Sequence, residues 1–223
     1  MTPEALLAAA EAALRGAADP ERAAAMSAYM RGRFPFLGVQ RPERARLERP
    51  LLAGLRLSDD DLARVADACW ALPEREFQYL GCVVMERHAK RVDAAFIAVV
   101  ERCITGKAWW DTVDHLAARV VGPMVRTHPA LAEVMDDWAG REDVWLARTA
   151  IIHQLGFREA TDADRLFGYC ALRAGDTDFF IRKGIGWALR QYARTEPEAV
   201  RAFVAEHRDV LSPLSVREAT KHL

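Results

Sequence analysis

The chain has 223 residues, enough for one compact domain or one continuous array of repeats. Its 51% hydrophobic and 28% charged residues are ordinary for a folded globular protein. No segment approaches the ~20 consecutive apolar residues of a membrane-spanning helix. Because phosphate contacts need clustered cations, the formal net charge of −1 is an objection to a nucleic-acid-binding role.

Helix signals recur along the whole chain, and no strand pattern competes with them. Thr2-Pro3 and Asp19-Pro20 each place a capping side chain before a proline, and Ser58 opens a segment like a capping box. Nine of the ten prolines fall near a predicted helix start, Pro35 being the exception. The sequence therefore predicts an all-α protein of about a dozen helices. Further starts are expected near Pro73, Asp93, Lys107, His128, Asp143, Thr161, Asp176, Thr195 and Ser212.

The close spacing of these helices, without linkers rich in Ser, Gly or Pro, favours stacked helical pairs that form an α-solenoid. We expect a single domain over residues 1–223. A simple helical bundle is the structural alternative, because the sequence has no clear repeat. Solenoids bind extended partners on their concave faces, but the pattern alone does not distinguish DNA from protein. Residues 31–60 carry a local charge of +3, which allows a basic groove.

The residues available for chemistry favour neither a metal site nor a cofactor. The four cysteines are far apart among apolar neighbours, which predicts buried single thiols in a reducing compartment. The six histidines lack the spacing of metal ligands, and there is no glycine-rich phosphate loop. Residues 1–15 mix Glu4 and Glu11 into an Ala/Leu pattern, unlike a signal peptide. We therefore expect a cytoplasmic protein with no metal, no cofactor and no membrane association.

Helical periodicity separates the two adjacent tryptophans of residues 108–121. Trp109 falls on the apolar stripe of this segment, which predicts that it belongs to the core. Trp110 and Asp114 are four residues apart and lie together on the flank of the stripe. The flank position leaves two interpretations open, a functional pair or an edge-of-core residue beside a solvated charge.

The helix expected over residues 178–194 combines aromatic and cationic side chains away from its own apolar stripe. Phe180 and Trp187 fall off the stripe, and Lys183 and Arg190 lie on the same side as Trp187. Aromatic rings can stack on sugars or bases while cations meet phosphates, which favours a binding surface. The alternative is that another helix covers this face.

Two other regions carry arginines that could meet phosphates. Arg148 lies on an apolar stripe, so we expect a carboxylate partner in a structural salt bridge or a phosphate contact. The stretch from Tyr29 to Gln40 mixes aromatic residues and glycines with Arg31 and Arg33 in a loop after a helix, and it suits a surface that touches a polyanion.

Taken together, these segments resemble the AlkD family of bacterial DNA alkylation repair proteins. The resemblance covers nearly the whole chain in the expected order. The matching segments are Tyr29-Met30, Phe34-Pro35-Phe36-Leu37-Gly38, Glu74-Arg75-Glu76-Phe77-Gln78-Tyr79, Trp109-Trp110-Asp111-Thr112-Val113-Asp114, Trp145 to Leu155, Phe179 to Arg190, Leu211 to Ser215 and Arg217-Glu218-Ala219.

The resemblance implies an α-solenoid of HEAT-like antiparallel helical pairs with a concave DNA-binding face. It further implies a monofunctional glycosylase that hydrolyses the N-glycosidic bond of N3- and N7-alkylated purines, such as 3-methyladenine and 7-methylguanine, in duplex DNA. The catalytic residues of the family match Trp110, Asp114 and Trp187. Its DNA-binding arginine matches Arg148, and Tyr29 matches a position close to the lesion.

Lys183, Arg190, Arg31, Arg33 and Gln40 are further candidate DNA contacts, and we expect a monomer. Ala147 departs from the pattern, because a second basic residue is expected before the arginine. Two alternatives remain from other functional classes. One is a non-catalytic HEAT-like protein that binds DNA structures, which the presence of both Trp110 and Asp114 disfavours. The other is a protein–protein scaffold, which the near-zero net charge suits better than DNA.

Overall fold

The computed structural model describes all 223 residues, which form helices and turns without a β-strand, so the all-α prediction is confirmed. Residue contacts group the chain into two compact units, Met1–Val99 and Val100–Leu223, and each is described by itself. A single domain and a concave DNA-binding face stay predictions. No helix combines the length and the apolar composition that crossing a membrane requires.

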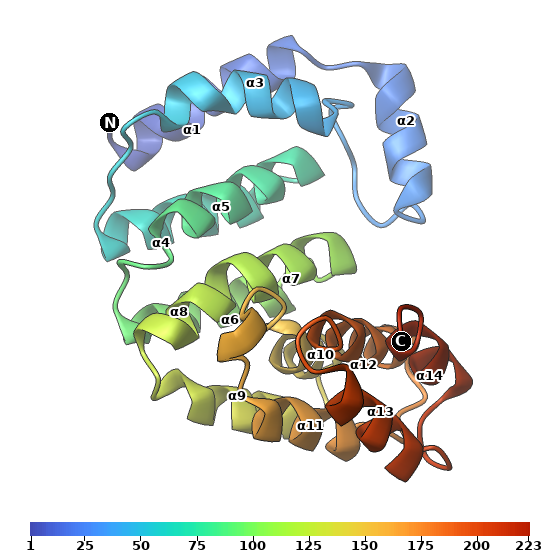
Figure 1. Ribbon diagram of the computed structural model, residues 1–223. Helices are drawn as coiled ribbons and strands as arrows, with labels where there is room; N and C mark the ends of the chain where they lie inside the picture. Colours follow the sequence, from blue (N-terminus) through green and yellow to red (C-terminus); the bar gives the residue numbers. More distant parts are fainter. The chain divides into compact units, whose positions relative to one another are not determined.

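The first unit consists mainly of helices that pack in pairs. Helix α1 lies against α3 and α4, and α4 lies against α5 (Figure 1). This packing of consecutive helices is consistent with the predicted α-solenoid. The helices of this unit are α1 (Pro3–Gly16), α2 (Pro20–Tyr29), α3 (Arg41–Leu52), α4 (Asp59–Ala71), α5 (Arg75–His88), the 3₁₀ turn η1 (Ala94–Phe96) and the start of α6 (Ile97–Thr105).

The helix starts of this unit follow the capping signals of the sequence. Thr2, Asp19 and Ser58 each accept a hydrogen bond from a backbone N–H in the first helical turn. Pro3 and Pro20 occupy the first helical positions, where no intrahelical N–H bond is lost. Pro50 is an exception to the predicted pattern, because it lies inside α3 near its C-terminal end.

A buried carboxylate holds the loop between α2 and α3. Glu76 is fully buried on α5 and accepts hydrogen bonds from the backbone N–H groups of Leu37, Gly38 and Val39, at 3.0, 2.9 and 3.1 Å. Gly38 has a φ of +90°, and a Cβ at this position would lie 2.1 Å from the carbonyl oxygen of Asp19. The loop therefore requires both a glycine at this position and an acceptor beneath it.

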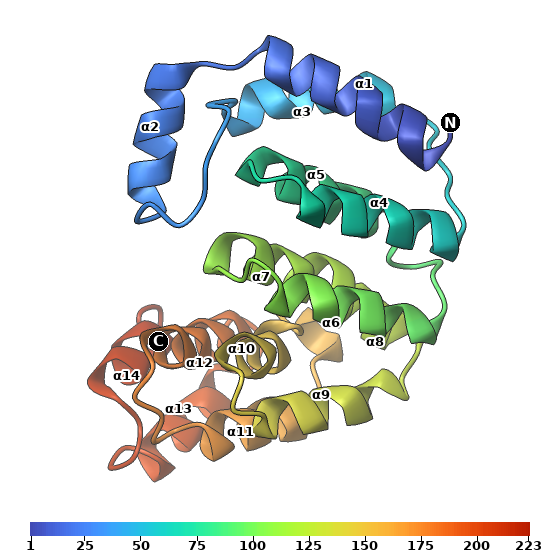
Figure 2. The same ribbon diagram turned by 180° about the vertical axis from the view of Figure 1, so that it is seen from behind.

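The second unit holds the remaining helices. Helix α10 packs against α9, α7 and α12, and α14 lies along α12 (Figure 2). The helices are α7 (Trp110–Leu116), the π-helical turn η2 (Ala117–Val121), α8 (Gly122–Thr127), α9 (Leu131–Gly140), α10 (Val144–Ile152), the 3₁₀ turn η3 (Arg158–Ala160), α11 (Ala163–Leu172), α12 (Phe179–Tyr192), α13 (Pro197–Glu206) and α14 (Pro213–Ala219).

A π-helical turn interrupts the helix that carries the Trp110/Asp114 pair. The turn follows α7 directly and ends just before Gly122-Pro123. Proline lacks the N–H group that would continue an α-helical ladder, which gives a physical reason for wider winding at this point. At Gly122 a Cβ would lie 2.4 Å from the carbonyl oxygen of His153, so the glycine permits close packing against the end of α10.

Candidate active site

Seven of the residues singled out in the sequence line one pocket of the second unit. Its volume is about 280 Å³, and side chains from α7, α10 and α12 form its wall. Trp110 and Asp114 therefore share a surface, as helical periodicity predicted. The lining residues are Trp110, Asp114, Arg148, Phe179, Phe180, Lys183, Trp187 and Arg190.

Asp114 and Arg148 form a two-point ion pair within this pocket. Arg148 donates from Nε to Oδ1 at 2.7 Å and from Nη2 to Oδ2 at 2.8 Å, and its Nη1 donates to the carbonyl oxygen of Phe180. The Arg148 side chain is only 4% exposed and that of Asp114 is 17% exposed. Asp114 is thus a carboxylate partner of Arg148, which is one of the two alternatives that the sequence left open. A phosphate contact by Arg148 stays a prediction.

The environment of Asp114 combines two opposing effects. Burial raises the pKa of the Asp114 carboxyl above its ordinary value, because the charged form loses hydration. The hydrogen bonds and the positive charge of Arg148 act in the opposite direction and favour the carboxylate. The result is a partly desolvated carboxylate whose two oxygens are fixed in position beside an aromatic surface.

A cluster of aromatic rings holds the three helices of the site together. Trp109 is 5% exposed, which confirms its predicted place in the core. Its ring lies edge-on to Phe180 at 4.9 Å and to Trp145 at 5.7 Å between centroids, and Trp145 lies 4.8 Å from Phe180. These residues are found at or just before the starts of α7, α10 and α12, so their packing fixes the distances between those helix starts.

A glycine allows α10 and α12 to approach at the buried arginine. A Cβ at Gly184 would lie 3.1 Å from Nη1 of Arg148 and 3.6 Å from Cγ2 of Ile152. Gly184 itself is buried in α12. The absence of a side chain at this position therefore leaves the space that the Arg148 guanidinium occupies.

The two other cations of the pocket are paired with the C-terminal helix. Lys183 Nζ lies 2.7 Å from Oε1 of Glu218, and Arg190 Nη1 donates to Oε2 at 2.7 Å. Another helix thus covers part of this side of α12, while Trp187 and both cations still line the pocket. DNA contacts by Lys183 and Arg190 stay predictions.

The other predicted DNA contacts belong to the first unit. Tyr29 is the last residue of α2 and is 72% exposed. Arg31, with a φ of 57°, and Arg33 follow it as exposed residues of the loop. Gln40 is exposed at the N-cap position of α3, and its side chain makes no capping hydrogen bond. None of these four residues lines the pocket described above, and their contacts with DNA stay predictions.

Two features of the site were not assigned a role from the sequence. Phe179 lines the pocket and is 55% exposed, which is unusual for a large aromatic side chain. Its place at the first position of α12, off the buried stripe, is the signal that could have identified it. Glu218 had no such signal, because its pairing with α12 depends on tertiary packing.

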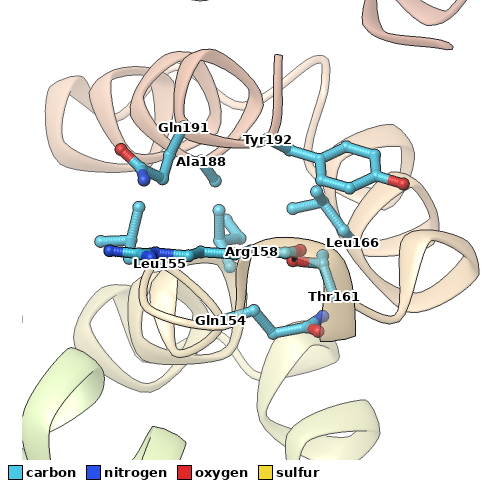
Figure 3. Close-up of a pocket in the computed structure, with 9 residues that line it drawn as sticks. Gln154, Leu155, Arg158, Thr161, Leu166, Ala188, Gln191 and Tyr192 are labelled. Atoms are coloured by element: carbon cyan, nitrogen blue, oxygen red, sulfur yellow. Dashed lines mark hydrogen bonds between the residues drawn. The ribbon is translucent and has the colours of Figure 1, made fainter. Parts of the chain in front are cut away.

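A second cavity of the same unit is a structural crevice. Figure 3 shows side chains of α11, α12 and the segment after α10 meeting there, Gln154 and Tyr192 among them. Its volume is about 10 Å³, close to the space of a single water molecule. The Gln154 amide bonds to the backbone N–H and C=O of Asp162, at 2.8 and 3.1 Å. The crevice therefore offers no room for a substrate. No group of three or more His, Cys, Asp or Glu side chains is placed to hold a metal ion.

Comparison with known proteins shows the family to which the chain belongs. No curated protein matches the chain. A solved structure described as a predicted DNA alkylation repair enzyme from Enterococcus faecalis is similar, with 34% identity and a TM-score of 0.85. The match covers 92% of this chain and 96% of that one. The family model described as DNA alkylation repair enzyme matches residues 10–223. The chain therefore belongs to the DNA alkylation repair enzyme family.

Proposed function

We propose that this protein is a monofunctional DNA glycosylase, which hydrolyses the N-glycosidic bond of N3- and N7-alkylated purines in duplex DNA. The observation that carries the proposal is the fixed Asp114 carboxylate in a pocket that Trp110 and Trp187 also line. Membership in a family of DNA alkylation repair enzymes supports the choice of substrate. We further propose that it acts as a cytoplasmic monomer.

The substrate chemistry explains why a carboxylate and two indoles suffice. Alkylation at N3 or N7 gives the purine a positive charge. When the C1′–N9 bond breaks, its electron pair neutralises that charge, so the base leaves without a general acid. The sugar is left electron-poor, with oxocarbenium character. Water adds its oxygen to C1′ and loses a proton, which yields the free base and an abasic site.

Asp114 would stabilise the positive charge that develops on the sugar. In a partly desolvated site an ionic interaction is stronger than in water, and a carboxylate that is already oriented costs no reorganisation. Arg148 uses one lone pair on each oxygen, so each oxygen keeps a second lone pair for the substrate. The same carboxylate would orient the attacking water and accept its proton.

Trp110 and Trp187 would contact the deoxyribose from the aromatic side. The electron-rich faces of indole rings attract a cationic sugar, with a contribution of about 1 kcal/mol for each ring. Phe179 adds a third, exposed aromatic surface at the same pocket. No lysine other than Lys183 lines this pocket, and its Nζ is held by Glu218 at 2.7 Å. An amine engaged in an ion pair is not free to attack C1′, which favours hydrolysis over a Schiff-base lyase step.

Release of free base from methylated duplex DNA tests the proposal. We expect the native chain to release 7-methylguanine and 3-methyladenine, and Asp114→Asn and Trp110→Ala to lose about 10²–10³-fold in single-turnover rate. Asp111→Asn makes the same change on the same helix outside the pocket and should keep the native rate within a few-fold. A native chain that binds methylated DNA but releases no base would instead be a non-catalytic DNA-binding protein.

A further inference from the structure

Helix α14 places the Glu218 carboxylate against two cations that line the pocket, Lys183 and Arg190. Glu218 bridges Lys183 and Arg190 with one oxygen each, both at 2.7 Å. Its side chain is 14% exposed, whereas those of Lys183 and Arg190 are 40% and 23% exposed. Lys183 and Arg190 are therefore more accessible to solvent than the Glu218 carboxylate that bridges them.

The packing of α14 on α12 holds this carboxylate in place. A Cβ at Gly186 would lie 2.5 Å from Cβ of Glu218 and 3.0 Å from the carbonyl oxygen of Ser215, so only glycine allows this approach. Ser215 Oγ donates to the carbonyl oxygen of Arg182 at 2.9 Å and thus ties the two helices together. Glu218 is consequently fixed by its backbone, in contrast to a surface glutamate on a mobile side chain.

The pairing leaves little free positive charge at the pocket. Arg148 is neutralised by Asp114, and Glu218 offsets one of the two charges of Lys183 and Arg190. The two cations hold the pKa of the Glu218 carboxyl below its ordinary value, so it is ionised at neutral pH. A DNA backbone phosphate, like a carboxylate, shares one negative charge between two oxygens, so it could accept from the same donors.

We infer that Glu218 competes with DNA backbone phosphates for Lys183 and Arg190. In the free protein it occupies these donors, and a duplex must displace it in order to bind them. Glu218 thereby weakens the binding of DNA that offers backbone contacts alone and speeds the release of such DNA. This inference rests on the proposed function, because it takes duplex DNA as the ligand.

Equilibrium binding of an unmodified duplex over a series of salt concentrations tests the competition. Glu218→Gln keeps the size of the side chain and removes its charge. We expect it to bind the duplex roughly threefold to tenfold more tightly than the native protein at low salt. The slope of log affinity against log salt concentration should become steeper by about one released ion. Glu198→Gln on α13 removes the same charge from an exposed pair with Arg201 and should change affinity less than twofold.

A double-mutant cycle separates competition from a merely structural role. In a Lys183→Met/Arg190→Met background, Glu218→Gln should produce no tightening, because the donors are gone. Weaker or unchanged binding by Glu218→Gln, or equal tightening in both backgrounds, would overturn the inference. Base release by the native protein is measured in parallel. If the native protein releases base but Glu218→Gln does not bind the duplex more tightly, only this inference is contradicted. If the native protein releases no base, the proposed glycosylase activity is contradicted.

Discussion

Arg148 donates two parallel hydrogen bonds, of 2.7 and 2.8 Å, to the carboxylate of Asp114, which lies 34 residues away in the sequence. A third hydrogen bond, from Nη1 to the carbonyl oxygen of Phe180, fixes the guanidinium on α12. The planar fork of arginine matches the two oxygens of a carboxylate, so this pair sets the orientation of Asp114 as well as its charge. It makes Arg148 a positioning residue for Asp114 in the proposed reaction.

Arg148→Lys should lower catalysis more than DNA binding. Lysine keeps the charge but loses the two-point geometry, and a misplaced catalytic group costs about 10²-fold in rate. We expect a loss of this order in single-turnover base release, with the dissociation constant for duplex DNA changed only a few-fold. Arg201→Lys, at an exposed pair on α13, serves as the control. Weakened binding with a native single-turnover rate would show instead that Arg148 serves a phosphate.

The raised pKa of Asp114 predicts a loss of activity on acidification. Only the carboxylate stabilises a cationic sugar, so base release should fall as the pH drops through this pKa, above the value of about 3.9 for a free aspartate. Arg148→Met removes the effect that opposes burial and should move the midpoint to still higher pH. The pH profile of single-turnover release, corrected for spontaneous base loss, measures both midpoints. A midpoint that is unmoved in Arg148→Met would contradict the coupling.

The same pKa has a consequence for stability. A carboxyl whose folded-state pKa is raised favours the folded state most below its unfolded pKa, and this contribution is lost as the pH rises through the folded pKa. The native protein should therefore lose stability relative to Asp114→Asn as the pH rises from the unfolded-state pKa of Asp114 through its raised folded-state pKa. Urea unfolding of both proteins at a series of pH values measures the difference. A constant difference would mean that Asp114 titrates as it does in the unfolded chain.

Gly184→Ala should reduce activity without a large loss of stability. The added methyl group would lie 3.1 Å from Nη1 of Arg148, so the guanidinium must shift by a few tenths of an ångström and carry Asp114 with it. We expect a loss of about tenfold in single-turnover release. Gly168→Ala on α11 is the matched control, because no atom lies within 4 Å of its Cβ. That control should keep native activity and gain up to about 1 kcal/mol in free energy of unfolding. Native activity in Gly184→Ala would mean that Arg148 can yield without consequence.

Local features of the fold could be predicted from the sequence. The caps at Asp19, Ser58 and Asp143 are hydrogen bonds between neighbours in sequence, so residue order alone indicates them. Trp109 is buried and Trp110 lines the pocket, as the helical periodicity of residues 108–121 predicted. Trp109 itself precedes α7 in extended backbone, so its burial comes from the packing of the helix starts.

Features that depend on tertiary packing could not be predicted in this way. The periodicity indicated that Arg148 needs a partner but not that the partner is Asp114, because the pair joins two helices far apart in sequence. The bridge from Glu218 to α12 is likewise a product of helix packing. The π-helical turn after α7 breaks the uniform winding on which the predicted periodicity of residues 108–121 depends, although Val120 is still buried.

Glu76→Gln should destabilise the loop that carries the predicted DNA contacts of the first unit. The carboxylate accepts three backbone N–H groups, whereas an amide presents one oxygen and a donor, so at least one buried N–H loses its acceptor. We expect a loss of about 1–3 kcal/mol in the free energy of unfolding. If Tyr29, Arg31 and Arg33 meet DNA, duplex affinity should fall as well. Glu11→Gln, at an exposed pair with Arg15, controls for the lost charge. Loss of stability with unchanged affinity would remove this loop from the DNA-binding surface.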